Sequence, residues 1–190
     1  EESIIDLVEL LGEELAGEIT ASEQTPSEVD SFEDDIPGSD TAEAAQPVGP
    51  PLFLVDDDQL TAQVIARQMR DINLDVSVFT LSKDFLKAID AAAAEGKAPM
   101  LLIDLVMPKL DGSGISGGVE VAQMVKKKYP ELVVMLMSDQ ITPDLETKLA
   151  PLKLAALILK PKKNQLSEDK GKQVLADMMM KVGAFVDPSA

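Results

Sequence analysis

From residue 52 onward, the sequence predicts an α/β fold in which a doubly wound parallel sheet carries helices on both faces. Short apolar runs of the strand type alternate there with segments of helical periodicity. This alternation is typical of parallel sheets whose two faces are both covered. In addition, four of the apolar runs end on a polar residue, and ligands of such folds bind beyond the carboxyl ends of the strands.

The elements follow from these patterns in chain order. We expect strands near residues 52–55, 75–79, 100–103, 132–137 and 156–159, and helices at about 59–72, 82–94, 118–128, 143–150 and 166–182. Gly96 suits the end of the second helix, and Pro130 stops the third. Five strand and helix units of this kind form an open sheet.

The start of the chain has a different pattern. Apolar residues recur at helical spacing through residues 1–20, at Ile4, Val8, Leu11, Leu15 and Ile19, with acidic residues between them. This predicts a short acidic amphipathic helix. Two interpretations stay open: the helix is a marginal remnant of a preceding domain, because short helices are weak alone, or it docks on a partner or on its own domain.

Residues 21–51 are rich in acidic residues, Ser, Ala, Thr and Pro, and we interpret them as a disordered linker. We therefore divide the chain into a helix at 1–20, a linker at 21–51, a domain at 52–184 and a tail at 185–190. Since the chain begins at Glu1 and not at Met, it can be a fragment of a longer protein.

Charge is distributed unevenly along the chain. The net charge is −17, but residues 1–50 hold 15 acidic and no basic residues, which leaves 34 − 15 = 19 acidic against 17 basic residues in the rest. The domain itself is near neutral. Direct nucleic-acid binding is not expected, because it requires clustered Lys or Arg, and the run Lys126–Lys128 is interpreted as the solvated face of a helix.

Composition excludes several other classes. The chain has no Cys and no His, so disulfides, zinc chemistry and His-based catalysis are excluded. We find no membrane span and no basic signal-peptide start, so a cytoplasmic protein without membrane contact is expected.

The polar residues at the strand ends form the chemical signal. LFLV precedes Asp56 and Asp57, LLI precedes Asp104, LVVMLM precedes Ser138, and ALIL precedes Lys160. Clustered carboxylates raise a pKa or hold a cation, and Mg²⁺ accepts a few carboxylates with waters and a phosphate oxygen. Lysine and serine bind phosphoryl oxygens. Together these groups predict phosphoryl transfer to a carboxylate.

Four motifs, LFLVDDD, LLIDLVMPKLDG, VVMLMSD and ALILKP, follow one another in this order. As a set they resemble the receiver domain of response regulators, which act in two-component phosphorelay signalling. The resemblance covers about residues 52–182. It implies a flavodoxin-like five-stranded parallel sheet in the order 2-1-3-4-5.

The resemblance also implies roles for individual residues. Asp104 would be the phosphoacceptor and a metal ligand. Asp57 would bind Mg²⁺ or Mn²⁺ directly, Asp56 would bind it through water, and the backbone carbonyl of Val106 would complete the set.

Further roles concern the phosphoryl group. Ser138 would supply the switch hydroxyl, Lys160 would pair with the phosphoryl group, and the bond before Pro161 would be cis, which costs little for X-Pro. Asp58 is interpreted as a helix N-cap, because an acidic residue is favoured there.

The sequence departs from the family at three positions. Leu157 stands where receivers carry an aromatic residue that reports phosphorylation. Val106 and Gln140 flank the path of a hydrolytic water, and an apolar Val106 cannot orient one. We therefore hypothesise a weak or different readout and a long-lived aspartyl phosphate.

A glycine-rich segment follows Pro108. Residues 112–117 formally match the dinucleotide-binding pattern, but they do not directly follow a strand. We interpret Gly112–Gly118 as a flexible loop beside the phosphorylation site.

The resemblance implies a signalling protein that catalyses only its own phosphorylation and dephosphorylation. Its expected partners are a histidine kinase or phosphotransfer protein and an unknown downstream protein, and Met178–Met180 are compatible with a homodimer interface. One alternative is a phosphorylation-independent interaction module. Another is a haloacid-dehalogenase-like phosphatase, in which Asp56 and Asp58 would be nucleophile and acid.

Overall fold

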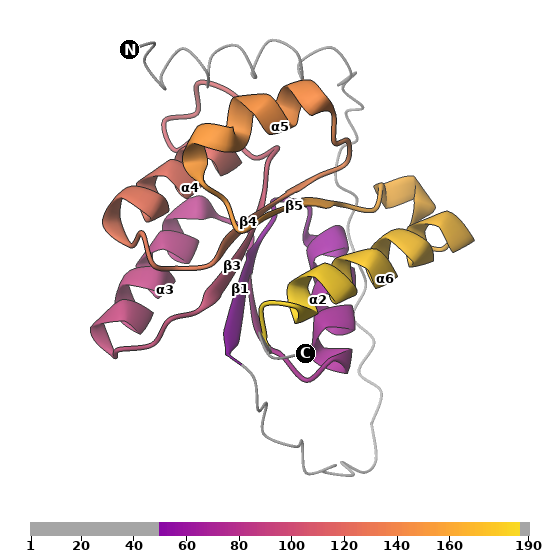
Figure 1. The fold of residues 1–190 in the computed structure, drawn as a ribbon, viewed down its shortest axis with the longest axis horizontal. Coiled ribbons are helices and arrows are strands. Elements are labelled where there is room, and N and C mark those ends of the chain that lie inside the picture. The colour runs from indigo at the N-terminus through magenta and orange to yellow at the C-terminus, as the bar shows by residue number, and fades with distance from the viewer. Residues whose placement is uncertain (1–49, 187–190) are drawn as a thin grey trace, which may run out of the picture.

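The computed structural model describes residues 50–186. The predicted helix at 1–20, nearly all of the linker and the last residues of the tail lie outside this range. The strands are β1 (Pro51–Val55), β2 (Asp75–Phe79), β3 (Met100–Asp104), β4 (Val134–Ser138) and β5 (Ala156–Leu159). The helices are α2 (Gln59–Asp71), α3 (Ser82–Ala94), α4 (Gly117–Lys128), α5 (Pro143–Leu149) and α6 (Asp169–Gly183). Figure 1 shows their arrangement.

The predicted sheet is confirmed. All four strand pairings are parallel, and the order is β2-β1-β3-β4-β5. The chain reverses direction across the sheet between β1 and β3, so the two strands lie side by side at the switch point where ligands of such sheets bind.

Several predicted boundaries shift. β4 begins at Val134 and not at residue 132, and it runs through Ser138. α6 begins at Asp169, three residues later than predicted, because a 3₁₀ turn at Lys163–Gln165 precedes it. Phe185 and Val186, which we assigned to the tail, are half-buried and pack against the core.

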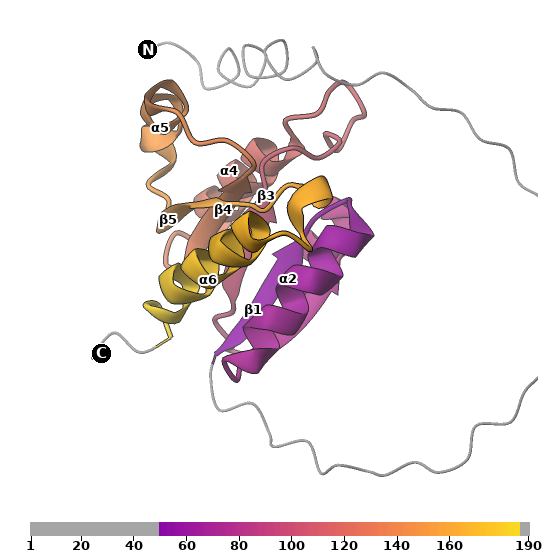
Figure 2. The same cartoon turned by 90° about the vertical axis from the view of Figure 1, so that its right-hand side faces the viewer.

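The sheet has two apolar faces, and alternate strand residues supply each one. α2 and α6 cover one face, where Leu52, Leu102 and Met135 contact residues such as Ile65 and Met178. These two helices lie in front of the sheet in Figure 2. Because β3 and β4 are buried over their whole length, their sequences are apolar without alternation.

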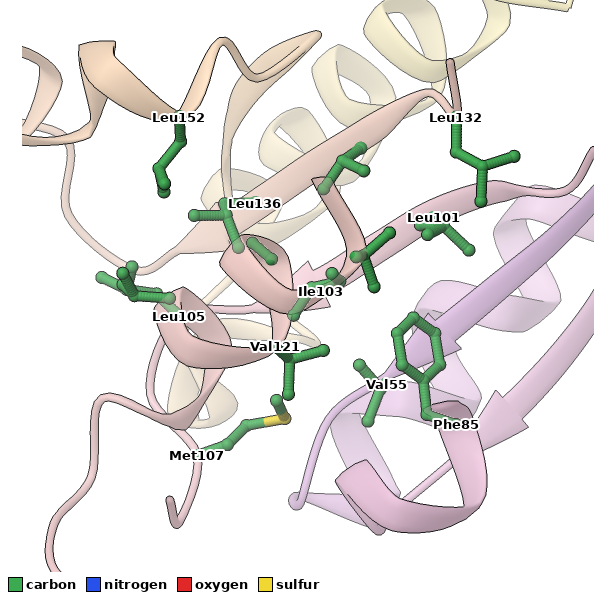
Figure 3. Packing of buried hydrophobic residues seen from close by; sticks show 14 of the residues in the cluster. Val55, Phe85, Leu101, Ile103, Leu105, Met107, Val121, Leu132, Leu136 and Leu152 are labelled. Atoms are coloured by element: carbon green, nitrogen blue, oxygen red, sulfur yellow. The ribbon is translucent and has the colours of Figure 1, made fainter. Parts of the chain in front are cut away.

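The opposite face carries α3, α4 and the end of α5. Its core joins Val55, Leu101 and Ile103 to Phe85 of α3 and Val121 of α4 (Figure 3). This core extends to Leu105 and Met107, beyond the end of β3. The chain that follows Asp104 is therefore anchored in the core.

The first turn of α4 packs directly on the end of β3. A Cβ atom on Gly118 would overlap the carbonyl oxygen of Asp104, and one on Gly117 would overlap the carbonyl of Pro108. Both glycines are buried. The absence of side chains there lets α4 approach the backbone that holds Asp104.

This contact predicts that Gly118→Ala destabilises the protein. Ala favours a helix by about 1 kcal/mol over Gly, but overlap with the backbone of β3 costs about 1–3 kcal/mol. We expect a lower urea midpoint by circular dichroism. Gly114→Ala is the control, because a Cβ atom there would make only ordinary contact with the Lys109 side chain. Equal midpoints for Gly118→Ala and the wild type would contradict the packing argument.

Candidate functional site

The site lies at the carboxyl ends of the central strands. Val55 pairs with Ile103 across β1 and β3, so Asp56 and Asp104 occupy neighbouring strand ends. Ser138 closes β4, and Lys160 directly follows β5. The sheet therefore brings together the polar residues that the sequence had marked at four separate strand ends.

Three carboxylates form an acidic cluster at this edge. One oxygen from each of Asp56, Asp57 and Asp104 lies within 4.8 Å of the others. Asp56 and Asp104 are buried, whereas Asp57 is exposed. The cluster is thus open to solvent on the side of Asp57.

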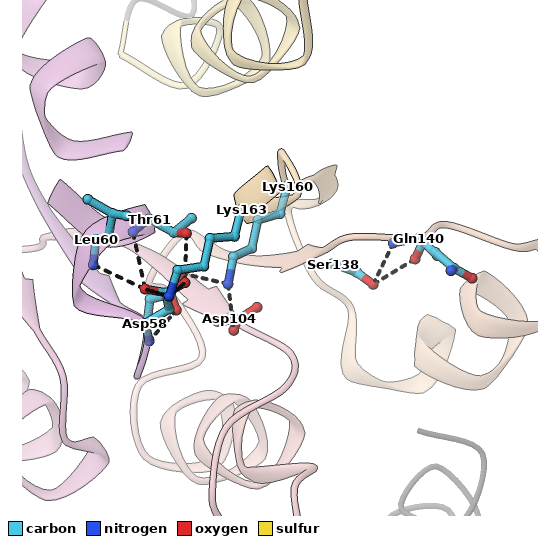
Figure 4. Close-up of polar contacts among 9 residues, drawn as sticks. Asp58, Leu60, Thr61, Asp104, Ser138, Gln140, Lys160 and Lys163 are labelled. Atoms are coloured by element: carbon cyan, nitrogen blue, oxygen red, sulfur yellow. Dashed lines mark hydrogen bonds and ion pairs between the residues drawn. The ribbon is translucent and has the colours of Figure 1, made fainter. Parts of the chain in front are cut away.

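Lys160 pairs with the two buried carboxylates. Its Nζ lies 2.7 Å from Oδ2 of Asp56 and donates a hydrogen bond of 2.9 Å to Oδ2 of Asp104. Figure 4 shows the lysine reaching across from the end of β5 toward Asp104. One ammonium group therefore serves two carboxylates.

The pKa values reflect this shortage of positive charge. Burial raises the pKa of Asp104 to about 7, against the opposing effect of Lys160 and with the help of the Asp56 charge. Burial also raises the pKa of Asp56. Burial lowers the pKa of Lys160, but Asp104 and Asp56 outweigh it and hold that pKa above its usual value.

The donor set fits a hard divalent cation. Three carboxylates and one ammonium leave a net charge of −3 + 1 = −2 when all are ionised. Oδ2 of Asp56 is buried and has the ion pair with Lys160 but no hydrogen bond of good geometry. Mg²⁺ prefers a site that offers a small number of carboxylates and leaves room for bound water. Asp56, Asp57 and Asp104 could therefore hold the ion.

Asp58 does not join this cluster. Its carboxylate accepts hydrogen bonds from the backbone N–H groups of Leu60 and Thr61 and from the Thr61 hydroxyl. Although burial acts in the opposite direction, these bonds hold the pKa of Asp58 below its usual value. The predicted N-cap role is therefore confirmed.

The Ser138 hydroxyl makes a local hydrogen bond. Its Oγ donates to the backbone carbonyl of Gln140 at 2.6 Å (Figure 4). Leu157 is half-buried and packs against the core of the α3 and α4 face. Ser138 and Leu157 thus lie on the paired strands β4 and β5, where Ser138 pairs with Leu159 and Leu157 pairs with Leu136.

The prediction of a cis bond before Pro161 is wrong, because the described residues contain no cis peptide bond. The trans form of an X-Pro bond is favoured by about 0.5–1 kcal/mol. Lys160 reaches both carboxylates with the trans bond in place.

The glycine-rich segment is more ordered than we expected. Met107 N donates to Ile115 O, Lys109 N donates to Gly114 O, and Leu110 N donates to the Glu120 carboxylate. Gly117 and Gly118 belong to α4. The predicted start of this helix at residue 118 is therefore confirmed to within one residue, and the interpretation as a flexible loop is wrong for Gly117.

Sequence reasoning missed Gly118 and Glu120 as supports of the site. One signal for close packing was present in the sequence. Glycine has a low helix propensity, so two consecutive glycines at the start of a helix indicate that side chains would not fit there. Glycines are equally typical of loops, so the sequence alone did not indicate close packing at these two positions.

Solved structures of other proteins share the fold of this chain. No curated protein sequence matches the chain. In the described part of the chain, no helix is long and apolar enough to cross a membrane. The structure is similar to CheY4 of Vibrio cholerae (14% identity, TM-score 0.53, covering 71% of this chain and 99% of that one). It is also similar to the receiver domain of NtrX from Brucella abortus (20%, 0.53, 73% and 99%).

A third similar structure is the response regulator DrrB of Thermotoga maritima, an OmpR/PhoB homolog. The identity is 18%, the TM-score is 0.53, and 73% of this chain is covered. The chain spans 52% of that protein. At these identities the likeness shows the fold.

The family is shown by the sequence. The family model described as the response regulator receiver domain matches residues 52–170, which is more than half of the chain and includes all four strand-end motifs. The chain therefore belongs to the response regulator receiver domain family, whose members act in two-component systems.

Proposed function

We propose that this receiver domain accepts a phosphoryl group on Asp104 and changes its protein contacts in response. One observation carries the proposal: the buried carboxylate of Asp104 lies 2.9 Å from the Lys160 ammonium, inside a cluster with two further carboxylates. A nucleophile, a cation site and a fixed positive charge are the groups that phosphoryl transfer requires.

The reaction follows from these positions. One carboxylate oxygen of Asp104 attacks the phosphorus atom of a phosphohistidine on a histidine kinase or phosphotransfer protein. The bond from phosphorus to the donor nitrogen breaks, and its electron pair stays on the imidazole. Asp57, Asp104 and the backbone carbonyl of Val106 would hold a Mg²⁺ ion directly and Asp56 would hold it through water, and this ion would supply positive charge for the phosphoryl oxygens.

Lys160 has two tasks in this proposal. Before transfer, it offsets part of the repulsion between Asp56 and Asp104 and favours the ionised, nucleophilic form of Asp104. After transfer, its ammonium can move to a phosphoryl oxygen, because the negative charge formerly on Asp104 then lies on the phosphoryl group. The long, flexible Lys side chain suits this movement.

The readout would begin at Ser138. Its hydroxyl can donate to a phosphoryl oxygen only by leaving the Gln140 carbonyl. With an aliphatic Leu157 in place of an aromatic residue, we propose that the response propagates through repacking of aliphatic side chains beside β5. The downstream partner is a protein.

The first prediction tests acceptance of the phosphoryl group. Incubation with acetyl phosphate and Mg²⁺ should add one phosphoryl group of about 80 Da by intact mass, and Asp104→Asn should abolish the addition. Asp58→Asn is the matched control, because it removes a neighbouring carboxylate but keeps an N-cap residue. A phosphorylation-independent module would show no added mass in any variant.

The second prediction concerns the metal. Because the cluster buries excess negative charge, Mg²⁺ should raise the melting temperature of the wild type at pH 8. At a Mg²⁺ concentration of 100 times Kd, the free energy of unfolding should rise by about 2.7 kcal/mol. Asp104→Asn should be more stable than the wild type in EDTA, since Asp56 still pairs with Lys160, and it should respond less to Mg²⁺. Asp58→Asn should respond as the wild type does. A melting temperature of the wild type that ignores Mg²⁺ would exclude the site.

The third prediction concerns the lifetime of the phosphoryl group. The Val106 side chain is half-buried against the apolar core, so it orients no water, and the aspartyl phosphate should persist for minutes or longer. Val106→Asn should shorten the lifetime. The rate of phosphate release after removal of the phosphoryl donor measures the lifetime in the wild type and in the variant. Loss of the phosphoryl group from the wild type within seconds would refute the hypothesis of a long-lived aspartyl phosphate.

A further inference from the structure

An apolar groove lies away from the acidic cluster, between the outer edge of the sheet and α6. Its lining is mostly apolar and contains one acidic and one basic residue: Ile141, Ile158, Leu159, Val174, Met178, Asp177 and Lys181. Leu159 keeps 37% of its surface exposed although it is a strand residue. The volume of about 280 Å³ lies below the range of about 300–1,000 Å³ typical of small-molecule sites. The groove therefore suits inserted side chains more than a whole ligand.

Positive charge flanks the groove along α6. Lys170, Val174, Asp177 and Lys181 share one face of the helix, because they stand at i, i+4, i+7 and i+11. Lys170 and Lys181 are both exposed. Asp177 accepts a hydrogen bond of 3.3 Å from Gln173 on the same helix. This face of α6 thus carries two lysines with Asp177 and Val174 between them, which gives it a net charge of 2 − 1 = +1.

The N-terminal segment of the chain has the complementary pattern. Residues 1–20 contain seven acidic and no basic residues, and their apolar residues Ile4, Val8, Leu11, Leu15 and Ile19 recur at helical spacing. All 17 Lys and Arg residues of the chain lie after residue 50. The segment therefore has one apolar face beside acidic residues, whereas the groove is mostly apolar and the face of α6 beside it has a small positive charge.

The connection between them is long enough. A chain of 30 residues, the number at positions 21–50, spans roughly 30 Å on average when it has no fixed structure. A domain of this size has a radius of gyration of about 14 Å, so the segment reaches the whole surface from Pro51. A tether of this length gives an effective concentration of roughly millimolar, so even weak contacts lead to binding.

We propose that residues 3–19 bind in this groove as an intramolecular ligand. The apolar residues of the segment contact Ile141, Leu159 and Val174, and its acidic residues lie beside Lys170 and Lys181. Bound in this way, the segment competes with any other protein for the same surface. The inference concerns binding alone and does not depend on phosphorylation of Asp104.

Disulfide trapping in the full chain tests this proposal, because the chain has no cysteine of its own. One variant combines Gly12→Cys with Met180→Cys. Met180 is 70% exposed and precedes Lys181 at the groove. The matched control combines Gly12→Cys with Met124→Cys, since Met124 is 45% exposed on α4, which packs on the opposite face of the sheet.

The intrachain disulfide should form about tenfold or more faster at Met180→Cys than at Met124→Cys, at protein concentrations where interchain products are minor. Adding Leu11→Asp should remove the difference, because it places a charge in the apolar strip. Equal rates at the two positions would overturn the proposal, and so would a preference for Met180→Cys that Leu11→Asp leaves intact. A disulfide at Met180→Cys that joins two chains would instead identify the occupant as a second copy.

Discussion

The contact of Lys160 with Asp56 and Asp104 is the interaction on which the rest of the site depends. Parallel pairing of β1 and β3 forces two carboxylates onto adjacent strand ends, where both are buried. Like charges in such a place repel each other, and burial penalises both. The ammonium group at 2.7 and 2.9 Å offsets part of this cost. The part of the cost that is not offset raises the pKa of Asp104 and makes the cluster attract a cation.

The surrounding fold keeps this arrangement in place. α4 packs on the carbonyl of Asp104 through Gly118, and Leu105 and Met107 are buried just beyond it. The segment from Met107 to Ser116 closes on itself through backbone hydrogen bonds and the Glu120 carboxylate. A precise position for the nucleophile matters because phosphoryl transfer relies on alignment and charge more than on covalent help from the protein.

The acidic cluster and the apolar groove share one short segment. Ser138 closes β4, its hydroxyl bonds to the carbonyl of Gln140, and the next residue, Ile141, lines the groove. A change at Ser138 therefore acts on backbone that is one residue from the groove wall. Leu159 of the groove pairs with Ser138 in the sheet and precedes Lys160. Ser138 and Lys160 are thus each connected to the groove through only a few residues of the chain.

The sequence by itself determined the architecture and which polar residues lie at the ends of the strands. Apolar runs buried on both faces indicate a parallel sheet, and polar residues at their carboxyl ends must meet at one edge, so Asp56, Asp57, Asp104, Ser138 and Lys160 could be chosen without coordinates. Only the tertiary structure decided how they interact. The sharing of one ammonium by two carboxylates, the hydrogen bond from Ser138 to Gln140, the trans bond before Pro161 and the packing of Gly118 on Asp104 depend on distances between segments far apart in the chain. Local pattern carries no information about such distances, because periodicity fixes which face a residue occupies but not what lies across from it.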